Sequence, residues 1–316
     1  MKKAILSVIF LFLAFQAACA SDEKEKAGKS KGSFIFGGYE RRYLVHVPLH
    51  LDRDKPVPLV FVLHGGGGSA KRMVQLTKGG FDALADKEGF IVVYPDGVGK
   101  HWNDGRGFYR YRAQRENIDD VGFISALIDR LTKSYNIDTK SIYVTGVSNG
   151  AMMSLRLACE LSDRIVAIAP VVGAMPVNLA SSCRPARSVS ILFINGTDDP
   201  LVPWEGGEVR FGHQRLGKIL SVPETVSTWV RHDACPSLSE QTKAPDTDPY
   251  DGTRIRKDVY SPCDDGVEIV FVTVEGGGHT WPGGYQYADE RIVGKTSEDI
   301  DACKVIWDFF KRHRRS

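Results

Sequence analysis

Few folds accommodate the strand-to-helix turn that the sequence places at residues 142–155. An apolar run rich in β-favouring residues stops at Gly146, passes through Ser148, reaches Gly150 and continues as a helix-compatible run. This G-x-S-x-G turn, the nucleophile elbow, is so tight that side chains at the two glycine positions would collide with their neighbours. It lifts the Ser148 hydroxyl clear of a sheet and points the N–H groups of the following helix at whatever reacts there. The five-residue pattern can arise by chance in a chain with 32 glycines, so the flanking strand and helix give it its weight.

Around this turn, strand-like apolar runs alternate with helical patterns. Strands are expected over residues 59–63, 90–94, 142–145, 165–172, 189–194, 254–260 and 267–274, after a hairpin over 33–48 that turns at Gly37-Gly38. Helices are expected over 73–87, 119–135, 223–232 and 297–311, and residues 97–116 form a long loop. Such alternation predicts an α/β fold, with a mostly parallel sheet covered by helices on both faces. No linker divides the chain, so residues 33–316 are expected to form one domain.

The first twenty residues have the pattern of a signal peptide. Two lysines precede an apolar run over 4–15, and small residues end at Ala18-Cys19-Ala20. The run is short for a permanent membrane span. Cys19 also fits a bacterial lipobox, although Gln16 replaces the usual aliphatic residue, so we favour release over lipid attachment and expect a membrane link only if Cys19 is lipidated. Residues 21–32 then predict a flexible leader, and the protein is expected to be secreted or periplasmic.

Charge and cysteine content indicate which binding partners and which covalent cross-links to expect. The sequence holds 41 Lys and Arg against 39 Asp and Glu, and removing Lys2 and Lys3 with the signal peptide balances them. A neutral balance argues against nucleic acid as a partner. The basic end at 311–315 is most simply a frayed helix terminus. Export permits disulfides, and the five cysteines past Cys19 leave one unpaired.

Two loops downstream of Ser148 supply the residues that a nucleophilic serine needs. A serine hydroxyl requires a base to take its proton and an acid to hold that base. One loop carries Asp198-Asp199 just after a strand, and the other carries His279 just after the last strand. The order serine, acid, histidine at strand ends is the order of this architecture. Chemistry alone does not separate Asp198 from Asp199.

The oxyanion hole is expected to combine two backbone N–H groups. Asn149 provides one, and the glycine run after Leu63 provides the other, with Gly66 preferred over Gly67. His64 is expected to hold this loop. The run loosely fits a dinucleotide fingerprint, but earlier strands precede it and no acidic residue follows about twenty positions on, so no nucleotide is expected. The eight histidines are scattered without an H-E-x-x-H pattern, so we expect no metal and no cofactor.

These motifs resemble a known family, the secreted esterases that include polyhydroxybutyrate depolymerases and feruloyl esterases, which have the α/β-hydrolase fold. The similarity runs from about Tyr43 to the C-terminal helix. It rests on the segments Leu63-His64-Gly65-Gly66-Gly67-Gly68, Asp119-Asp120-Val121-Gly122-Phe123-Ile124, Gly146-Val147-Ser148-Asn149-Gly150-Ala151-Met152, Ile168-Ala169-Pro170-Val171, Gly196-Thr197-Asp198-Asp199-Pro200-Leu201-Val202-Pro203 and Gly277-Gly278-His279-Thr280-Trp281-Pro282-Gly283-Gly284.

The resemblance implies a serine carboxylic-ester hydrolase that acts on polyhydroxybutyrate-type polyesters or on feruloyl or acetyl esters of plant polysaccharide. The family pattern H-G-T-x-D-x-x-V-P puts the catalytic acid at Asp199, although Asn195 replaces its first residue. The triad is then Ser148, Asp199 and His279. The resemblance also implies disulfides that pair Cys159 with Cys183 and Cys235 with Cys263, which leaves Cys303 free.

Aromatic residues are common in the loops near the expected site, where their faces suit a phenolic acid, a sugar or a polyester segment. They are Trp102, Tyr109, Tyr111, Trp204, Trp281, Tyr285 and Tyr287, and we select Trp102, Trp204 and Trp281 as substrate-binding candidates. Several of these rings are equally compatible with loop packing. Two alternatives stay open. One is a peptidase of the same fold, and the other is a catalytically silent protein that binds polysaccharide or polymer.

Overall fold

The computed structural model describes residues 28–52 and 54–315. Its strands are β1 (Gly28–Phe36), β2 (Tyr39–Val47), β3 (Val57–Leu63), β4 (Ile91–Pro95), β5 (Ile137–Val147), β6 (Ala167–Val171), β7 (Ser190–Gly196), β8 (Gly207–Phe211), β9 (Gln214–Ile219), β10 (Glu240–Lys243), β11 (Arg254–Tyr260) and β12 (Ile269–Glu275). Its α-helices are α1 (Ala70–Leu76), α2 (Gly80–Glu88), α3 (Arg112–Arg115), α4 (Asp120–Ser134), α5 (Asn149–Glu160), α6 (Val177–Ser182), α7 (Val222–His232), α8 (Glu290–Val293) and α9 (Ala302–Phe310). Short 3₁₀ turns lie at Val98–Lys100 and Asp264–Gly266.

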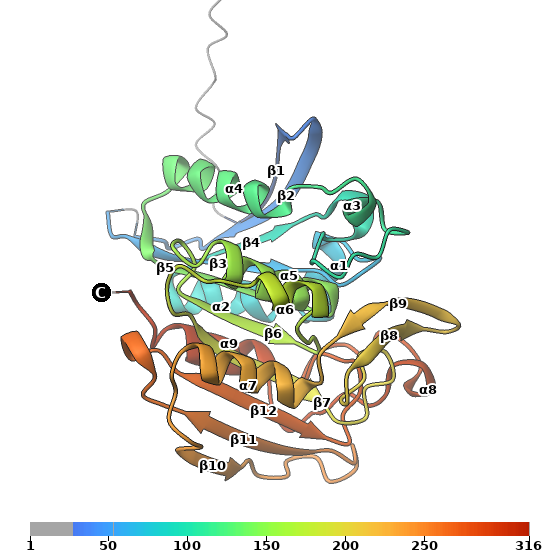
Figure 1. Ribbon diagram of the computed structural model, residues 1–316. Helices are drawn as coiled ribbons and strands as arrows, with labels where there is room; N and C mark the ends of the chain where they lie inside the picture. The colour runs from blue at the N-terminus through green and yellow to red at the C-terminus, as the bar shows by residue number, and fades with distance from the viewer. Residues whose placement is uncertain (1–27, 53, 316) are drawn as a thin grey trace, which may run out of the picture.

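One ten-stranded sheet crosses this part of the chain, in the order β1-β2-β4-β3-β5-β6-β7-β12-β11-β10 (Figure 1). The six central strands, from β4 to β12, are mutually parallel. The outer strands on both sides pair antiparallel. This confirms the predicted fold class, and β8 and β9 form a separate antiparallel pair.

The helices form a layer on each face of the sheet (Figure 1). Buried residues of α4, α5 and α7 pack in one apolar core, and those of α1, α2 and α9 pack in the other. The inner strands are therefore largely buried on both faces, which is why their sequences are mostly apolar. Among the described residues, no helix has the length and apolarity needed to cross a membrane.

The N-terminal hairpin forms as predicted, but it begins earlier. Its turn uses Gly37 and Gly38, both with positive φ, which suits a two-residue hairpin. β1 starts at Gly28, so the predicted leader over 21–32 is wrong for residues 28–32, which lie in a strand. The predicted signal peptide, residues 1–20, lies outside the described residues, as does the rest of that leader.

Two helix predictions need correction. The expected helix over 73–87 is two helices, because Lys78 and Gly79 have φ of 51° and 70°, and this left-handed backbone ends α1. The last helix begins at Ala302 rather than at residue 297, with the Asp301 carboxylate capping its first turn.

The C-terminal segment is tied down rather than frayed. Arg312 and His313 pair with Glu268, and Arg314 pairs with Asp138. Arg315 donates its backbone N–H to the Lys140 carbonyl at 2.9 Å. The prediction of a frayed terminus is therefore wrong for residues 312–315, which are fastened to the amino ends of the central strands.

Candidate active site

Ser148 occupies a strained turn between β5 and α5. Its φ of 56° and ψ of −116° lie outside the regions that non-glycine residues prefer. A Cβ at Gly146 would come within 2.7 Å of the Gly150 carbonyl carbon, and one at Gly150 within 2.4 Å of the Leu63 carbonyl oxygen. Only glycine fits at both positions, which is the physical reason for the G-x-S-x-G spacing. The turn leaves Ser148 half-buried at the carboxyl end of its strand.

Asp199 and His279 form a buried hydrogen-bonded pair. The His279 Nδ1–H donates to Asp199 Oδ2 at 2.7 Å, and the two side chains are 4% and 2% exposed. The second oxygen of Asp199 accepts the N–H groups of Leu201 and Val202, each at 2.8 Å. These three bonds fix the carboxylate and the imidazole tautomer, and they leave His279 Nε2 as the nitrogen able to exchange a proton.

Asp198 has a different environment from Asp199. Its side chain is exposed and accepts a hydrogen bond from the neighbouring Thr197 hydroxyl at 2.8 Å. Within the described part of the chain, its side chain makes no hydrogen bond or ion pair with His279. The structure thus separates two adjacent aspartates that chemistry alone leaves equivalent.

The three residues stand at one edge of the sheet. Ser148 follows β5, Asp199 follows β7 and His279 follows β12. These strands run parallel within the block β5-β6-β7-β12, so their carboxyl ends share an edge (Figure 1). Ligand sites of open parallel sheets lie at this edge.

The glycine loop after β3 keeps N–H donors available, because neither Gly65 nor Gly66 donates its N–H to another of the described residues. The Gly67 N–H is used by the Lys100 carbonyl at 2.9 Å, whereas the Gly66 N–H has no partner among the described residues. Asn149 opens α5, where the first N–H groups lack partners within the helix. Gly66 and Asn149 therefore suit an anion better than Gly67 does.

His64 holds this loop, as predicted. Its Nδ1–H donates to the Gly65 carbonyl at 2.7 Å, and its Nε2 accepts the Gly97 N–H at 3.0 Å. Burial lowers the pKa of His64 to about 4, so the ring is neutral near pH 7 and fits this acceptor role.

Two of the three selected tryptophans are not at an exposed rim. Trp102 and Trp281 are fully buried. Trp102 donates its indole N–H to the His64 carbonyl at 2.9 Å, and Trp281 packs edge-on against Phe81. Their prediction as substrate-binding residues is corrected, because the loops fold back over the core. Trp204 is half-buried against Phe271, and Tyr109, Tyr285 and Tyr287 are exposed.

Two buried charges beside the elbow were not predicted from the sequence. Asp104 and Arg106 form an ion pair at 2.8 Å with side chains 0% and 3% exposed. They lie in the loop over 97–116, which has no periodicity from which burial is readable. The only signal was the presence of charged residues among its glycines and aromatics.

The cysteines pair as the resemblance implied. Cys159 is bridged to Cys183 and Cys235 to Cys263, and Cys303 is free and buried. Two bridges fit an extracellular protein.

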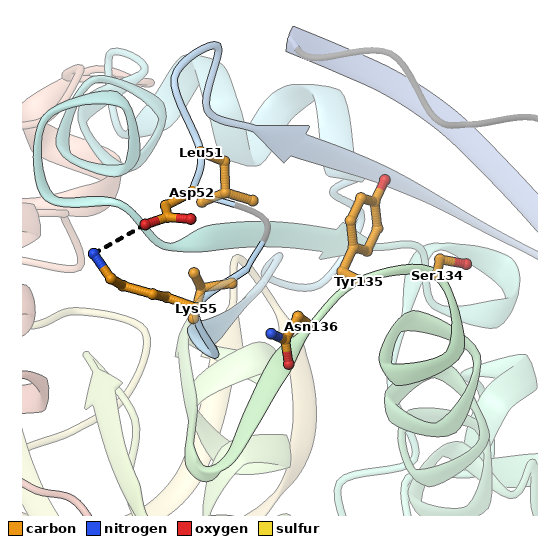
Figure 2. A pocket seen from close by; sticks show the side chains of 7 residues that line it. Leu51, Asp52, Lys55, Ser134, Tyr135 and Asn136 are labelled. Carbon is orange, nitrogen blue, oxygen red and sulfur yellow. Dashed lines mark ion pairs between the residues drawn. The ribbon is translucent and has the colours of Figure 1, made fainter.

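A cavity of about 120 Å³ lies away from this edge (Figure 2). Asp52 and Lys55 form an ion pair at its rim, and Ser134, Tyr135 and Asn136 line it just before β5. It therefore sits at the amino ends of β3 and β5, opposite Ser148. Within residues 28–52 and 54–315, no group of three His, Cys, Asp or Glu side chains is arranged to hold a metal ion.

The sheet order, the helix layers and the strand-end site define an α/β-hydrolase. A thermostable esterase of known structure has the same fold, with a TM-score of 0.57 at 16% identity over 91% of this chain and 63% of that one. The family model for phospholipases and carboxylesterases matches residues 50–236. The chain belongs to this phospholipase/carboxylesterase family.

Relatives of similar length agree with that membership. NocK of Nocardia uniformis subsp. tsuyamanensis, a protein assigned to the esterases, is 33% identical over 87% of this chain and 80% of its own. Feruloyl esterase D of Neurospora crassa is 26% identical over 96% of both chains. Together with the fold, these similarities support a carboxylic ester hydrolase.

Proposed function

We propose that the protein is a secreted serine esterase with the triad Ser148, His279 and Asp199. The observation that carries the proposal is the buried hydrogen bond from His279 to Asp199 at the sheet edge that also presents the Ser148 elbow. A histidine held through Nδ1 by an ionised carboxylate is the base that a serine nucleophile requires.

The reaction follows from these roles. The Ser148 hydroxyl oxygen attacks the ester carbonyl while His279 Nε2 takes the hydroxyl proton. The carbonyl oxygen becomes an oxyanion that accepts hydrogen bonds from the Gly66 and Asn149 N–H groups. His279 returns the proton to the departing alcohol, which leaves an acyl group on Ser148. Water then attacks the acyl group by the same route, and the free acid leaves.

For the substrate we propose polyhydroxybutyrate-type polyesters or feruloyl and acetyl esters of plant polysaccharide. Motif similarity supports both classes, and similarity to the Neurospora crassa feruloyl esterase over nearly the whole chain supports the second. Of the aromatic residues selected from the sequence, half-buried Tyr111 and Trp204 and exposed Tyr109, Tyr285 and Tyr287 have ring surface that such substrates can reach. Export through residues 1–20, with removal of that segment, is part of the proposal.

The test combines labelling with substrate preference. A fluorophosphonate should label Ser148 in the wild type and fail to label Ser148→Ala, whereas Ser154→Ala, six residues further along within α5, should be labelled normally. Rates are then compared on methyl ferulate, acetylated xylan, p-nitrophenyl butyrate, hydroxybutyrate oligomers and a peptide. Cleavage of the peptide alone would make the protein a peptidase, and absence of both labelling and hydrolysis would leave a binding protein.

A further inference from the structure

Trp102 contacts both segments that carry the oxyanion donors. Its indole N–H donates to the carbonyl of His64, two residues before Gly66, at 2.9 Å. Its backbone N–H donates to the Asn149 side-chain oxygen at 2.8 Å, and its carbonyl accepts from the Asn149 side-chain nitrogen at 3.2 Å. One buried residue therefore joins the glycine loop to the start of α5, and Gly66 and Asn149 are 83 positions apart in the chain.

Asp104 holds the other side of the Asn149 amide. Its Oδ2 accepts the second hydrogen of Asn149 Nδ2 at 2.6 Å. The same carboxylate accepts from Arg106 and from Gln114 Nε2, at 2.8 Å and 2.9 Å. All four side chains are buried, and the Asn149 amide makes one hydrogen bond at its oxygen and two at its nitrogen, so its orientation is fixed.

This arrangement exceeds what packing requires. An apolar residue at position 149 would cover the core without bringing a buried carboxylate and guanidinium with it, and burying such charges is costly. A fixed separation of two N–H donors, in contrast, is what stabilisation of an oxyanion demands, because a displacement of about 1 Å can cost roughly 10²-fold in rate. Glycine loops do not maintain such a separation by themselves.

We propose that Trp102 and Asp104 are positioning residues for the oxyanion hole, acting through the Asn149 side chain and the His64 carbonyl. The inference rests on the proposed function, since it assigns the Gly66 and Asn149 N–H groups to the oxyanion. It replaces the expected role of Trp102 in binding substrate. Neither residue touches the ester. Each sets where the two donors stand before the ester arrives.

The first test removes one hydrogen bond and keeps the ring. In Trp102→Phe the bond to the His64 carbonyl is lost. Trp229→Phe is the matched control, because Trp229 is equally buried, lies on α7 and has no hydrogen-bond partner for its indole nitrogen within the described residues. Both variants are titrated for active sites, and kcat, KM and inhibition by n-butylboronic acid are measured per site. The boronate adduct of Ser148 places an oxygen in the oxyanion hole.

For Trp102→Phe we expect kcat to fall roughly 10-fold, a fraction of the 10²–10³ lost when a donor is removed outright. Affinity for the boronate should weaken in parallel while KM stays unchanged, since the donors act on the tetrahedral oxygen. Trp229→Phe should match the wild type in kcat, KM and boronate affinity. A purely structural role would lower Tm in both variants and leave kcat and boronate affinity per site alone.

A second variant guards against misfolding. Asn149→Ala keeps the backbone N–H and removes the amide that Trp102 and Asp104 hold, so it should show the same paired loss at unchanged KM. If Trp102→Phe does not fold, benzothienylalanine at position 102 keeps the ring shape without the N–H donor. The proposal is overturned if Ser148 labels and esters are cleaved, yet these variants retain kcat and boronate affinity within twofold. A wild type that neither labels nor cleaves esters rejects the proposed function instead.

Discussion

Asp198 and Asp199 show how position alone separates two identical side chains. Asp199 is buried and fixed by two backbone N–H groups and His279, whereas Asp198 is exposed beside Thr197. Sequence motifs select Asp199 only through resemblance to a family, because nothing in the dipeptide itself distinguishes the two. The distinction arises from a turn that directs one carboxylate inward.

This contrast gives a paired prediction. Asp199→Asn replaces the acceptor of the His279 proton with an amide and should lower kcat about 10⁴-fold through the wrong imidazole tautomer. Asp198→Asn should keep kcat within about twofold, since its side chain makes only a surface contact. Both are assayed on p-nitrophenyl butyrate. Equal losses of kcat in the two variants would contradict the assignment of Asp199 as the catalytic acid.

His64 makes stability depend on pH. Its pKa falls from 6.5 to about 4 on folding, because burial disfavours the charged ring. The folded state therefore binds this proton less readily, and the contribution to stability is complete above pH 6.5 and is lost as pH falls toward 4. An NMR titration of the ring should give a midpoint near 4. A midpoint near 6.5 would mean that water reaches the ring.

At the scale of elements, the buried strands of the main sheet were predictable from the sequence, whereas the exposed hairpin was not. Strands such as β7 and β12 are mostly apolar because both of their faces are covered. The β8–β9 hairpin escaped prediction, since its residues are mostly exposed and only Val209, Leu216 and Ile219 are buried. The break between α1 and α2 had a readable signal in Gly79-Gly80, which the helical spacing of the apolar residues obscured.

The second disulfide links two segments that are separated in the chain by β10 and β11. Cys235 lies just past α7 and Cys263 lies between β11 and β12, with a sequence separation of 28. Replacing both cysteines with alanine should lower the free energy of unfolding by about 3 kcal/mol, because the unfolded chain regains the freedom of that loop. Urea unfolding under oxidising conditions measures it. A loss under about 0.5 kcal/mol would contradict the expectation.

At the scale of the whole molecule, the C-terminal segment ties together strands that lie apart in the sheet. Glu268, just before β12, receives Arg312 and His313, while Arg314 reaches Asp138 at the start of β5. The sequence itself shows only a cluster of positive charges at residues 311–315. Its partners come from distant segments, and no local pattern predicts them.

Low pH should weaken the contacts that Glu268 makes with the C-terminal segment. Burial opposes the charge of Glu268, but hydrogen bonds from His313 and Arg312 outweigh it and lower its pKa from 4.5 to about 2. Its contribution is present above pH 4.5 and is lost as pH falls toward 2. Glu268→Gln should therefore cost about 1 to 2 kcal/mol at pH 7, after allowance for solvent screening, and almost nothing near pH 2. Urea unfolding of the wild type and Glu268→Gln between pH 2 and pH 7 measures this difference in free energy of unfolding. A difference that stays constant with pH would contradict the prediction.

The fastened end also determines how the protein can be presented to a solid polymer. Arg315 is held at the amino end of β5, and Val147 lies seven positions after Lys140 along that strand, a distance of about 23 Å at the usual rise. A support coupled beside Arg315 would therefore hold the molecule with its reacting edge outward. Insoluble fibres or granules, which cannot diffuse into a matrix, would then meet that edge directly.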